Sequence, residues 1–318
     1  MAAARAAAIL AEMLPPLRGR VTANAVLAPT TWFRVGGAAE ALVRPADAAD
    51  LAQFLAALPH EVNTVAIGAA SNLIVRDGGV HGVVIRLARG YNEIQMEADG
   101  VVAGAACLDV TVAEHAAAAG LAGLEFLSGI PGTVGGAVAM NAGAYGSDVA
   151  ATLDWAEIVT RDGTAVRLSA PQLCFAYRHS VLPPGAVVTR ARFRACSGEP
   201  ATIAARMAEI RAAREATQPV RARTGGSTFR NPDHMKAWEL IDAAGCRGLV
   251  RGAAQVSDKH CNFLLNTGGA TAADIEGLGS EVRRRVEAMS GITLHWEIRR
   301  IGIPGTRLEP RFPLEIVP

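Results

Sequence analysis

Two glycine-rich stretches in the first half of the chain hold the residues most suited to chemistry. They are VAIGAASNLIVRDGG, residues 65–79, and LSGIPGTVGGAVAMNAGAYG, residues 127–146. Glycine, serine and asparagine permit positive φ angles and close backbone approach, so successive N–H groups can converge on a phosphate. Together the stretches predict two loops that hold one large phosphorylated ligand, although either loop alone could equally be a tight connection in a compact α/β domain.

Three further segments hold polar residues where the pattern of a helix or strand does not require them. They are YRHS at 177–180, GGSTFRNP at 225–232 and HWEIRR at 295–300. In the last segment Glu297 alternates with apolar residues, so its carboxylate projects from the opposite face of the expected strand. From position alone Glu297 could be a solvated partner of Arg299, Ser227 a turn or capping hydroxyl, and Arg178 an ordinary surface arginine.

The composition excludes several classes of function. With 31 basic and 30 acidic residues among 318, the formal net charge is +1, so no overall field attracts nucleic acid or an anionic membrane. The hydrophobic content of 50% is enough for two domains with cores of their own. The five cysteines lack CxxC spacing and are odd in number, which argues against a disulfide framework or a zinc site. We therefore expect no metal, and small buried thiols in a reducing cytosol.

The N-terminal segment MAAARAAAILAEMLPP is typical of a short amphipathic helix and not of a signal peptide. Glu12 interrupts its apolar run, and Pro15 and Pro16 end it. No apolar run approaches the roughly eighteen residues that a membrane span requires. The sequence therefore predicts a cytoplasmic protein without a membrane partner.

The elements that must position these segments alternate between helix and strand in the first part of the chain. Apolar residues at helical spacing predict a helix over 47–58 with one buried face. Arg190, Arg192 and Arg194 alternate with apolar residues, so we expect them on a solvated strand face. The other expected elements are strands at 62–67, 82–87, 101–106 and 188–195, a helix at 109–119, and a hairpin at 155–168 that turns at Asp162 and Gly163.

Helical periodicity dominates after a change of composition near residues 198–200. We expect a helix running to about Thr217, a second over 235–244, and a third over 271–290 that opens with the capping-box-like TAAD. A strand over 292–302 follows. The predicted domains are thus 1–199 with a core of about 31–199, then 200–302, and an extended tail over 303–318. The apolar faces of the first and third helices are expected to bury Ile203, Met207, Ile210, Ile275, Leu278, Val282, Val286 and Met289.

The ordered set of segments resembles the UDP-N-acetylenolpyruvoylglucosamine reductase family. TWFRVGGAAE at 31–40 comes first, followed by GAASNLIVRDGG, SGIPGTVGGAVAMNAGAYG, YRHS, GSTFRNP and HWEIRRIG. The resemblance implies an α+β fold, with an FAD-binding domain of the vanillyl-alcohol-oxidase (PCMH) type in two subdomains and a C-terminal α+β substrate domain. It also implies NADPH-dependent reduction of UDP-N-acetylglucosamine enolpyruvate to UDP-N-acetylmuramate for peptidoglycan synthesis. In GAASN the family usually has one more glycine.

The resemblance also assigns roles to individual residues. Ser227 falls on the general acid, and Arg178 and Glu297 fall on the two residues that stabilise the substrate enolate. The implied substrate contacts are Tyr177, Arg211, Arg214 and Asn231. The implied FAD contacts are Gly68, Ser71, Asn72, Gly129, Pro131, Gly132, Gly135, Gly136, Asn141, Gly143 and Tyr145. Because neither glycine loop contains histidine or cysteine, we expect non-covalent FAD; His260 is expected to be structural.

Two other classes of function share parts of this pattern. A flavin-dependent carbohydrate or alcohol oxidase would use the same flavin domain with oxygen as acceptor, but has no need of GSTFRNP and WEIRR together. A non-catalytic flavin-binding sensor would not need Arg178, Ser227 and Glu297. Reduction of the flavin by NADPH, and its reoxidation by the UDP-sugar alone, distinguishes the reductase from both.

Overall fold

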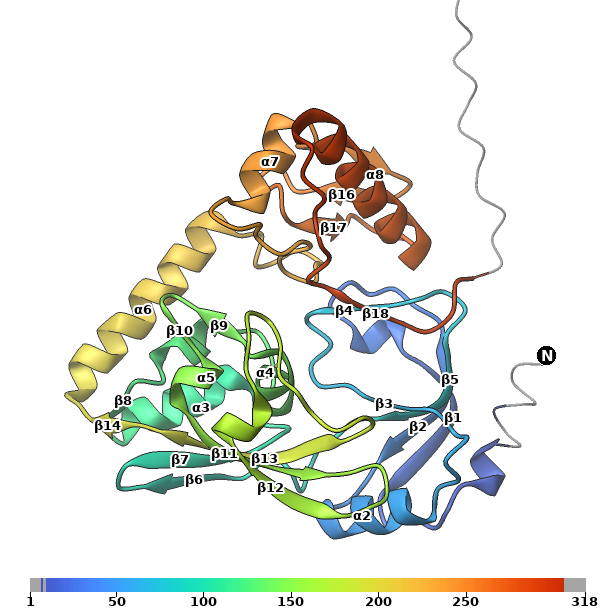
Figure 1. Ribbon diagram of the computed structural model, residues 1–318, viewed down its shortest axis with the longest axis vertical. Helices are drawn as coiled ribbons and strands as arrows, with labels where there is room; N and C mark the ends of the chain where they lie inside the picture. The colour runs from blue at the N-terminus through green and yellow to red at the C-terminus, as the bar shows by residue number, and fades with distance from the viewer. Residues whose placement is uncertain (1–6, 8–9, 306–318) are drawn as a thin grey trace, which may run out of the picture.

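The computed structural model describes residue 7 and residues 10–305 of the chain (Figure 1). Residues 10–13 are helical, within the expected N-terminal helix. Apart from residue 7, the rest of that helix lies outside the described residues. The expected tail lies outside them from residue 306 onward. Two N-terminal subdomains carry a C-terminal unit, which Figure 1 draws in orange and red. This arrangement confirms the predicted α+β class.

The first subdomain is built on a four-stranded sheet in the order β1-β2-β5-β3. Strands β2 and β3 both run parallel to β5, and β1 pairs with β2 in antiparallel fashion. The predicted helix over 47–58 is confirmed as α2 (Ala48–Ala57), because Asp47 caps it and Leu51, Phe54 and Leu55 pack against the sheet. The strands are β1 (Arg20–Val26), β2 (Ala38–Arg44), β3 (Thr64–Ala66) and β5 (Val80–Ile85).

The second subdomain is a five-stranded antiparallel sheet in the order β12-β11-β13-β7-β6, covered by helices. Its strands are β6 (Ile94–Glu97), β7 (Gly100–Gly104), β11 (Leu153–Val159), β12 (Ala165–Ser169) and β13 (Val187–Arg194). Its helices are α3 (Asp109–Ala118) and α4 (Val134–Met140), and α6 (Pro200–Thr217) buries Ile203 and Met207 in the same core. The predicted helix over 109–119 and the hairpin β11–β12 are confirmed.

Two sequence-based predictions for this subdomain are wrong. Arg192 is not on a solvated face: its side chain is 13% exposed and pairs with Glu97, Asp99 and Asp154 at 2.6–2.8 Å. Strands β6 and β11 and the β6–β7 turn bring those carboxylates together, which the sequence of β13 alone does not indicate. All five cysteines are free as expected, but Cys174 and Cys196 are exposed and not buried.

The C-terminal unit packs two helices against a three-stranded sheet. It comprises α7 (Ala237–Ala243), β15 (Val250–Arg251), β16 (Ala254–Val256), β17 (Leu264–Asn266) and α8 (Ala272–Ser290). The predicted capping box is confirmed, with Thr271 and Asp274 satisfying each other's backbone N–H groups. Met289 was expected in the core but is 48% exposed, because the core along α8 ends at Val286.

The expected strand over 292–302 forms only in its last part, β18 (Arg299–Ile301). This strand leaves the C-terminal unit and pairs in parallel with β4 (Leu73–Val75) of the first subdomain. Nearby, Arg76 bonds Glu276 at 3.0 Å, and the Asp77 carboxylate accepts from the first N–H groups of α8 at 2.9 Å. The C-terminal unit is thereby fixed to the subdomain that carries the first glycine loop.

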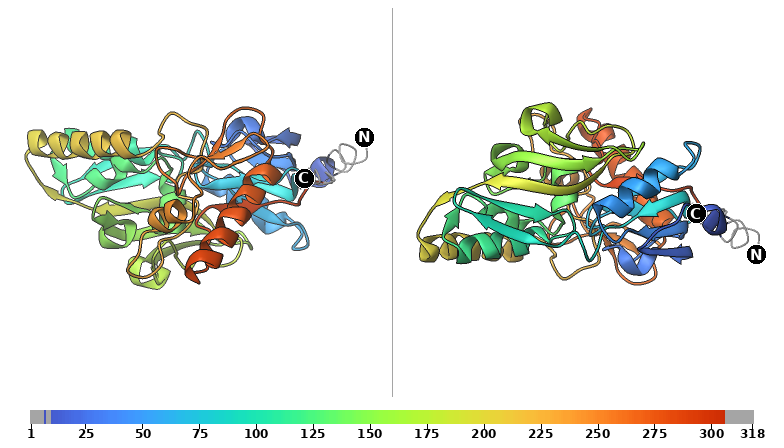
Figure 2. Two further views of the ribbon diagram at one scale, coloured as in Figure 1. Left: turned by 90° about the horizontal axis from the view of Figure 1, so that it is seen from above. Right: turned by 90° about the horizontal axis from the view of Figure 1, so that it is seen from below.

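Helix α6 runs along the second subdomain and leads up to the C-terminal unit (Figures 1 and 2). The domain division at residue 200, where α6 begins, stays a prediction. In the described part of the chain no helix is long and apolar enough to cross a membrane. The short elements are η1 (Ala28–Thr30), β8 (Leu121–Ala122), η2 (Glu125–Gly129), β9 (Gly143–Ala144), β10 (Ser147–Asp148), α5 (Val149–Thr152), η3 (Ala170–Leu173) and β14 (Cys196–Ser197).

Candidate active site

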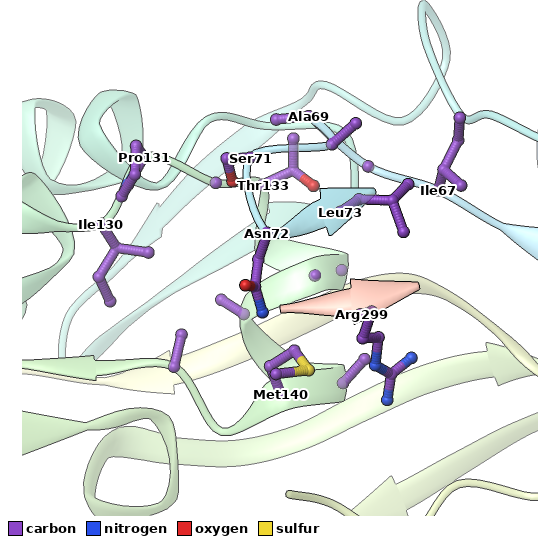
Figure 3. Close-up of a pocket in the computed structure, with 18 of the residues that line it drawn as sticks. Ile67, Ala69, Ser71, Asn72, Leu73, Ile130, Pro131, Thr133, Met140 and Arg299 are labelled. Carbon is purple, nitrogen blue, oxygen red and sulfur yellow. The ribbon is translucent and has the colours of Figure 1, made fainter. Parts of the chain in front are cut away.

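Both glycine loops line one cleft of about 1540 Å³, where the two subdomains and the C-terminal unit meet. The first loop follows β3, at the carboxyl edge of the parallel strands β2, β5 and β3, which is where ligands bind in such sheets. Figure 3 shows one wall of the cleft, with Ser71 and Asn72 from the first loop, Thr133 from the second, and Arg299 from β18. The cleft is large enough for a dinucleotide.

The two loops touch each other through a glycine. A Cβ atom on Gly68 would lie 2.3 Å from Oγ1 of Thr133, so a larger residue would force the Thr133 side chain or the loops to shift. Every predicted FAD contact except Asn141 lines the cleft. The Asn141 side chain instead accepts from the Ala150 N–H at 2.9 Å and donates to the Ala176 carbonyl at 3.0 Å. Asn141 therefore holds the second loop against the YRHS segment.

Asn72 links the first loop to the segment that carries Glu297. Its amide donates to the Glu297 carbonyl at 3.2 Å, and its own carbonyl accepts from the Arg299 N–H at 3.1 Å. Glu297 is thus positioned by backbone contacts with the cofactor loop as well as by its own side chain.

The three predicted catalytic residues converge on this cleft from distant parts of the sequence. Nε of Arg178 donates to Oε1 of Glu297 at 2.8 Å across 119 residues of chain, with the side chains 24% and 12% exposed. Arg178 has a φ of 55°, a left-handed conformation that arginine rarely adopts. Ser227 lies in a bridge to Phe263 and also lines the cleft. The alternative pairing of Glu297 with Arg299 on a solvated face is therefore wrong.

Burial raises the pKa of the Glu297 carboxyl, and the nearby charges of Arg178 and Arg230 oppose that rise without cancelling it. Among the described residues, Oε2 of Glu297 has no hydrogen-bond partner, whereas Oε1 accepts from Arg178. A proton on Oε2 would leave the bond to Arg178 intact. The side chain can therefore act as a neutral hydrogen-bond donor.

The predicted substrate contacts separate into two groups. Arg214 lines the cleft, where burial lowers its pKa and its Nε donates to Oε1 of Gln218 at 3.2 Å. Arg211 is exposed and does not line the cleft, although it lies only three residues earlier on α6. Tyr177 is 54% exposed with its ring 5.3 Å from the Arg178 guanidinium, and Asn231 accepts the Ala237 N–H at the start of α7.

Sequence reasoning missed two arginines at the far end of the cleft. Arg44 ends β2 and Arg86 follows β5, so both stand at the same sheet edge as the first glycine loop. Burial, and then the charge of Arg44, lowers the pKa of Arg86. Neither guanidinium has an acidic partner within residues 10–305. An arginine at the carboxyl end of two neighbouring parallel strands was the signal available in the sequence.

The cleft suits a polar cofactor with phosphate groups. Besides the close glycines, it holds buried polar atoms with no hydrogen-bond partner in the described structure, namely both carboxyl oxygens of Asp109 and the hydroxyls of Ser180 and Thr224. Such atoms are rare in folded proteins unless a ligand or water supplies the partner. Within the described residues, no group of three or more metal-ligating side chains is close enough to hold a metal ion.

Comparisons with known proteins decide the family. A model of an FAD binding domain matches residues 39–169, and a model of the UDP-N-acetylenolpyruvoylglucosamine reductase C-terminal domain matches residues 218–301. The chain belongs to the UDP-N-acetylenolpyruvoylglucosamine reductase family. The reductase of Acidiphilium cryptum is 67% identical over 291 residues, which is 92% of this chain and 94% of that protein. The reductase of Granulibacter bethesdensis is 66% identical over 92% of this chain and 94% of its own.

Solved structures agree with this membership. The crystal structure of the reductase (MurB) from Thermus caldophilus superposes with a TM-score of 0.78 at 36% identity, covering 90% of this chain and 100% of that one. The predicted FAD-binding domain, followed by a reductase-specific C-terminal domain, is thereby confirmed. The family membership also confirms the expected FAD-dependent oxidoreductase class.

Proposed function

We propose that this chain reduces UDP-N-acetylglucosamine enolpyruvate to UDP-N-acetylmuramate with NADPH, a step in the synthesis of peptidoglycan precursors. The observation that carries the proposal is the convergence of Arg178, Ser227 and Glu297 on the cleft lined by both glycine loops. Bound FAD would carry the hydride from NADPH to the methylene carbon of the enolpyruvyl ether. We place this reaction in the cytoplasm.

Arg178 and Glu297 act on the substrate carboxylate, where negative charge grows as the hydride arrives. The Arg178 guanidinium offers a planar fork that binds a carboxylate in bidentate fashion. Its Nε already donates to Oε1 of Glu297, so this hydrogen bond fixes its orientation before substrate binds. Glu297, with a pKa raised by burial, donates from Oε2 to the enolate oxygen as a neutral acid.

Ser227 supplies the final proton, to the carbon adjacent to the carboxylate. Its backbone is fixed by the bridge to Phe263, which directs a short side chain into the cleft. A serine hydroxyl is a weak acid in water, so proton transfer requires a cationic environment that stabilises the alkoxide. Arg178 and Arg214 line the same cleft and contribute positive charge to it.

The glycine loops and the basic residues are the proposed contacts of the two diphosphate groups. We assign the FAD diphosphate to the loops at 68–72 and 129–136, which pack together through Gly68 and Thr133. Arg214 is the cation placed to contact the substrate diphosphate within the cleft. Tyr177, Arg211 and Asn231 stay proposed substrate contacts, although all three stand outside the cleft lining.

FAD is expected to be held without a covalent bond. The cleft lining within the described residues contains no cysteine, and its one histidine, His179, belongs to neither glycine loop. Acid precipitation of the holoenzyme should therefore leave a yellow supernatant and a colourless pellet. A yellow pellet would show that the flavin is attached to the chain.

Anaerobic spectroscopy of the purified holoenzyme tests the reaction itself. NADPH should bleach the flavin absorbance, and UDP-N-acetylglucosamine enolpyruvate should restore it in the absence of oxygen. Rapid recovery with oxygen but none with the UDP-sugar would identify an oxidase. Failure of NADPH to bleach the flavin would remove the reductase assignment.

A further inference from the structure

Arg44 and Arg86 are two half-buried arginines to which the proposed reaction gives no role. Arg44 is the last residue of β2, Arg86 follows β5, and both line the cleft. Within residues 10–305 neither guanidinium forms an ion pair or a side-chain hydrogen bond. Arg192 shows the contrast, because three carboxylates surround its guanidinium at 2.6–2.8 Å. Two cations in a cleft wall without a counter-charge from the chain indicate a site for an anion.

The strand register brings the two arginines side by side. Val43 and Ile85 are partners in the parallel ladder of β2 and β5. The Arg86 N–H donates to the Val43 carbonyl at 2.9 Å, so Arg44 and Arg86 occupy the next position of the register. Neighbouring strands lie about 4.8 Å apart, which keeps the two like charges close to each other. Burial and the charge of Arg44 both lower the pKa of Arg86, as expected for cations that share a site.

Alternation along the strands directs both side chains to the face that carries the first glycine loop. Leu42 and Val84, each two residues before an arginine, belong on that face to the same buried cluster as Ile67, at the start of the loop. The Ile67 N–H donates to the Ile85 carbonyl at 2.9 Å, so the loop leaves the sheet one strand away from Arg86. The arginine pair therefore lies beside the start of this loop.

We propose that Arg44 and Arg86 together bind the diphosphate of FAD, in addition to the backbone N–H groups of the loop at 68–72. The proposal rests on the assignment of the diphosphate to that loop under the proposed function. The diphosphate carries one negative charge for each arginine, and the planar guanidinium fork suits phosphate oxygens. Binding replaces the repulsion between two like charges by two attractive contacts. The pair therefore stabilises the FAD-bound protein and destabilises the empty one.

FAD affinity and its salt dependence test this role, measured by the recovery of flavin fluorescence when the holoenzyme is diluted into increasing concentrations of KCl. Arg44→Gln and Arg86→Gln keep a polar side chain but remove the charge. Each should weaken FAD binding roughly 10- to 100-fold at low salt, as expected for a lost charge-assisted hydrogen bond. The difference from the unaltered protein should shrink at high salt, because ions screen the attraction. Arg86→Lys restores the charge without the fork, so it should recover part of the affinity and the salt dependence.

Thermal unfolding of the full chain, with and without FAD, gives a second readout. Without FAD, Arg86→Gln relieves the repulsion from Arg44 and should raise the Tm. With saturating FAD, the same substitution should lower the Tm, because it weakens a ligand that binds only the folded state. A merely structural role of Arg86 would instead lower the Tm in both conditions.

Arg161→Gln is the matched control. Arg161 is also half-buried, but it lies outside the cleft lining and donates to four backbone carbonyls between residues 55 and 62. Its substitution should lower the Tm with and without FAD and leave FAD affinity unchanged.

Two results would overturn the role of the arginine pair. One is that Arg44→Gln or Arg86→Gln binds FAD as tightly as the unaltered protein, and the other is that their loss of affinity is equal at low and high salt. Complete failure of the unaltered protein to bind FAD would instead overturn the proposed function, which distinguishes the two failures.

Discussion

At the scale of single residues, the site depends on two side chains, those of Arg178 and Glu297, that lie 119 residues apart in the sequence. Arg178 and Glu297 bond at 2.8 Å in a cleft wall, with Glu297 only 12% exposed. Burial of these two groups costs free energy, which the bond between Arg178 Nε and Glu297 Oε1 offsets in part. The left-handed backbone of Arg178 is consistent with a functional demand, because strained conformations gather at functional sites.

Substitution of this pair should act mainly on the transition state. Arg178→Lys keeps the charge but loses the bidentate fork, and Glu297→Gln keeps a donor but a weaker acid. We expect each to lower kcat and kcat/KM by roughly 10²- to 10³-fold, with a much smaller rise in KM. Steady-state kinetics with the UDP-sugar varied measure this, and a raised KM at near-normal kcat would show that the residue only binds ground-state substrate.

The same pair predicts a pH dependence. The neutral form of Glu297 is the donor, so the substrate half-reaction should slow as pH rises through the raised pKa of that carboxyl. Glu297→Gln should remove this dependence. Arg167→Lys is a suitable control, because Arg167 pairs with Glu157 on an exposed face outside the cleft. This substitution should change neither the rate of the substrate half-reaction nor its pH dependence.

At the scale of elements, the cleft depends on two loops that meet where Gly68 of the first packs against the Thr133 side chain of the second. Gly68→Ala would place a Cβ atom 2.3 Å from Oγ1 of Thr133, so the Thr133 side chain or the loops themselves must move. We expect FAD affinity to fall at least tenfold, measured by flavin fluorescence. Gly198→Ala is similarly crowded, with its Cβ 2.7 Å from that of Ala122, but lies outside the cleft lining. Gly198→Ala should lower stability without lowering FAD affinity. Equal losses of FAD affinity in the two variants would show that the contact between the loops does not hold FAD.

Elements with local causes could be predicted from the sequence. Helices α2, α6 and α8 have apolar residues at helical spacing and clear starts, and the β11–β12 hairpin has its Asp-Gly turn. The strand predicted over 292–302 is longer than the observed β18, because its partner, β4, comes from another subdomain. Arg192 was misplaced for the same reason, since its three acidic partners come from other segments.

The site could be predicted only in part. The glycine loops and Arg178, Ser227 and Glu297 could be singled out because they form short segments in a fixed order, and all of these segments line one cleft; the catalytic roles stay predictions. Asn141 and Asn231 stay predicted ligand contacts, and in the structure their side chains bond backbone groups of the protein. Arg44 and Arg86 were missed because an arginine at the end of a strand indicates a place in the cleft wall only once its strand is known to have a parallel neighbour, which local spacing does not show.

At the scale of the whole molecule, the cleft exists because the C-terminal unit is fixed to the first subdomain. Asp77 accepts two N–H groups at the start of α8, and Thr271 caps the same helix from within the C-terminal unit. Either Asp77→Ala or Thr271→Ala should lower the free energy of unfolding by about 1 kcal/mol, measured in urea. Only Asp77→Ala removes a contact between the units, so it alone should speed FAD release severalfold. Equal FAD release from both variants would contradict this coupling.

Ser227 is the proposed proton donor of the second half-reaction, and rapid-mixing spectroscopy of Ser227→Ala tests this role most directly. With NADPH alone, the variant should reduce its flavin at close to the normal rate. When UDP-N-acetylglucosamine enolpyruvate is then added, flavin reoxidation should be slower by roughly 10²- to 10⁴-fold, as expected for a lost general acid. Equal slowing of both half-reactions would show that Ser227 only maintains the site, and normal reoxidation would show that another group donates the proton.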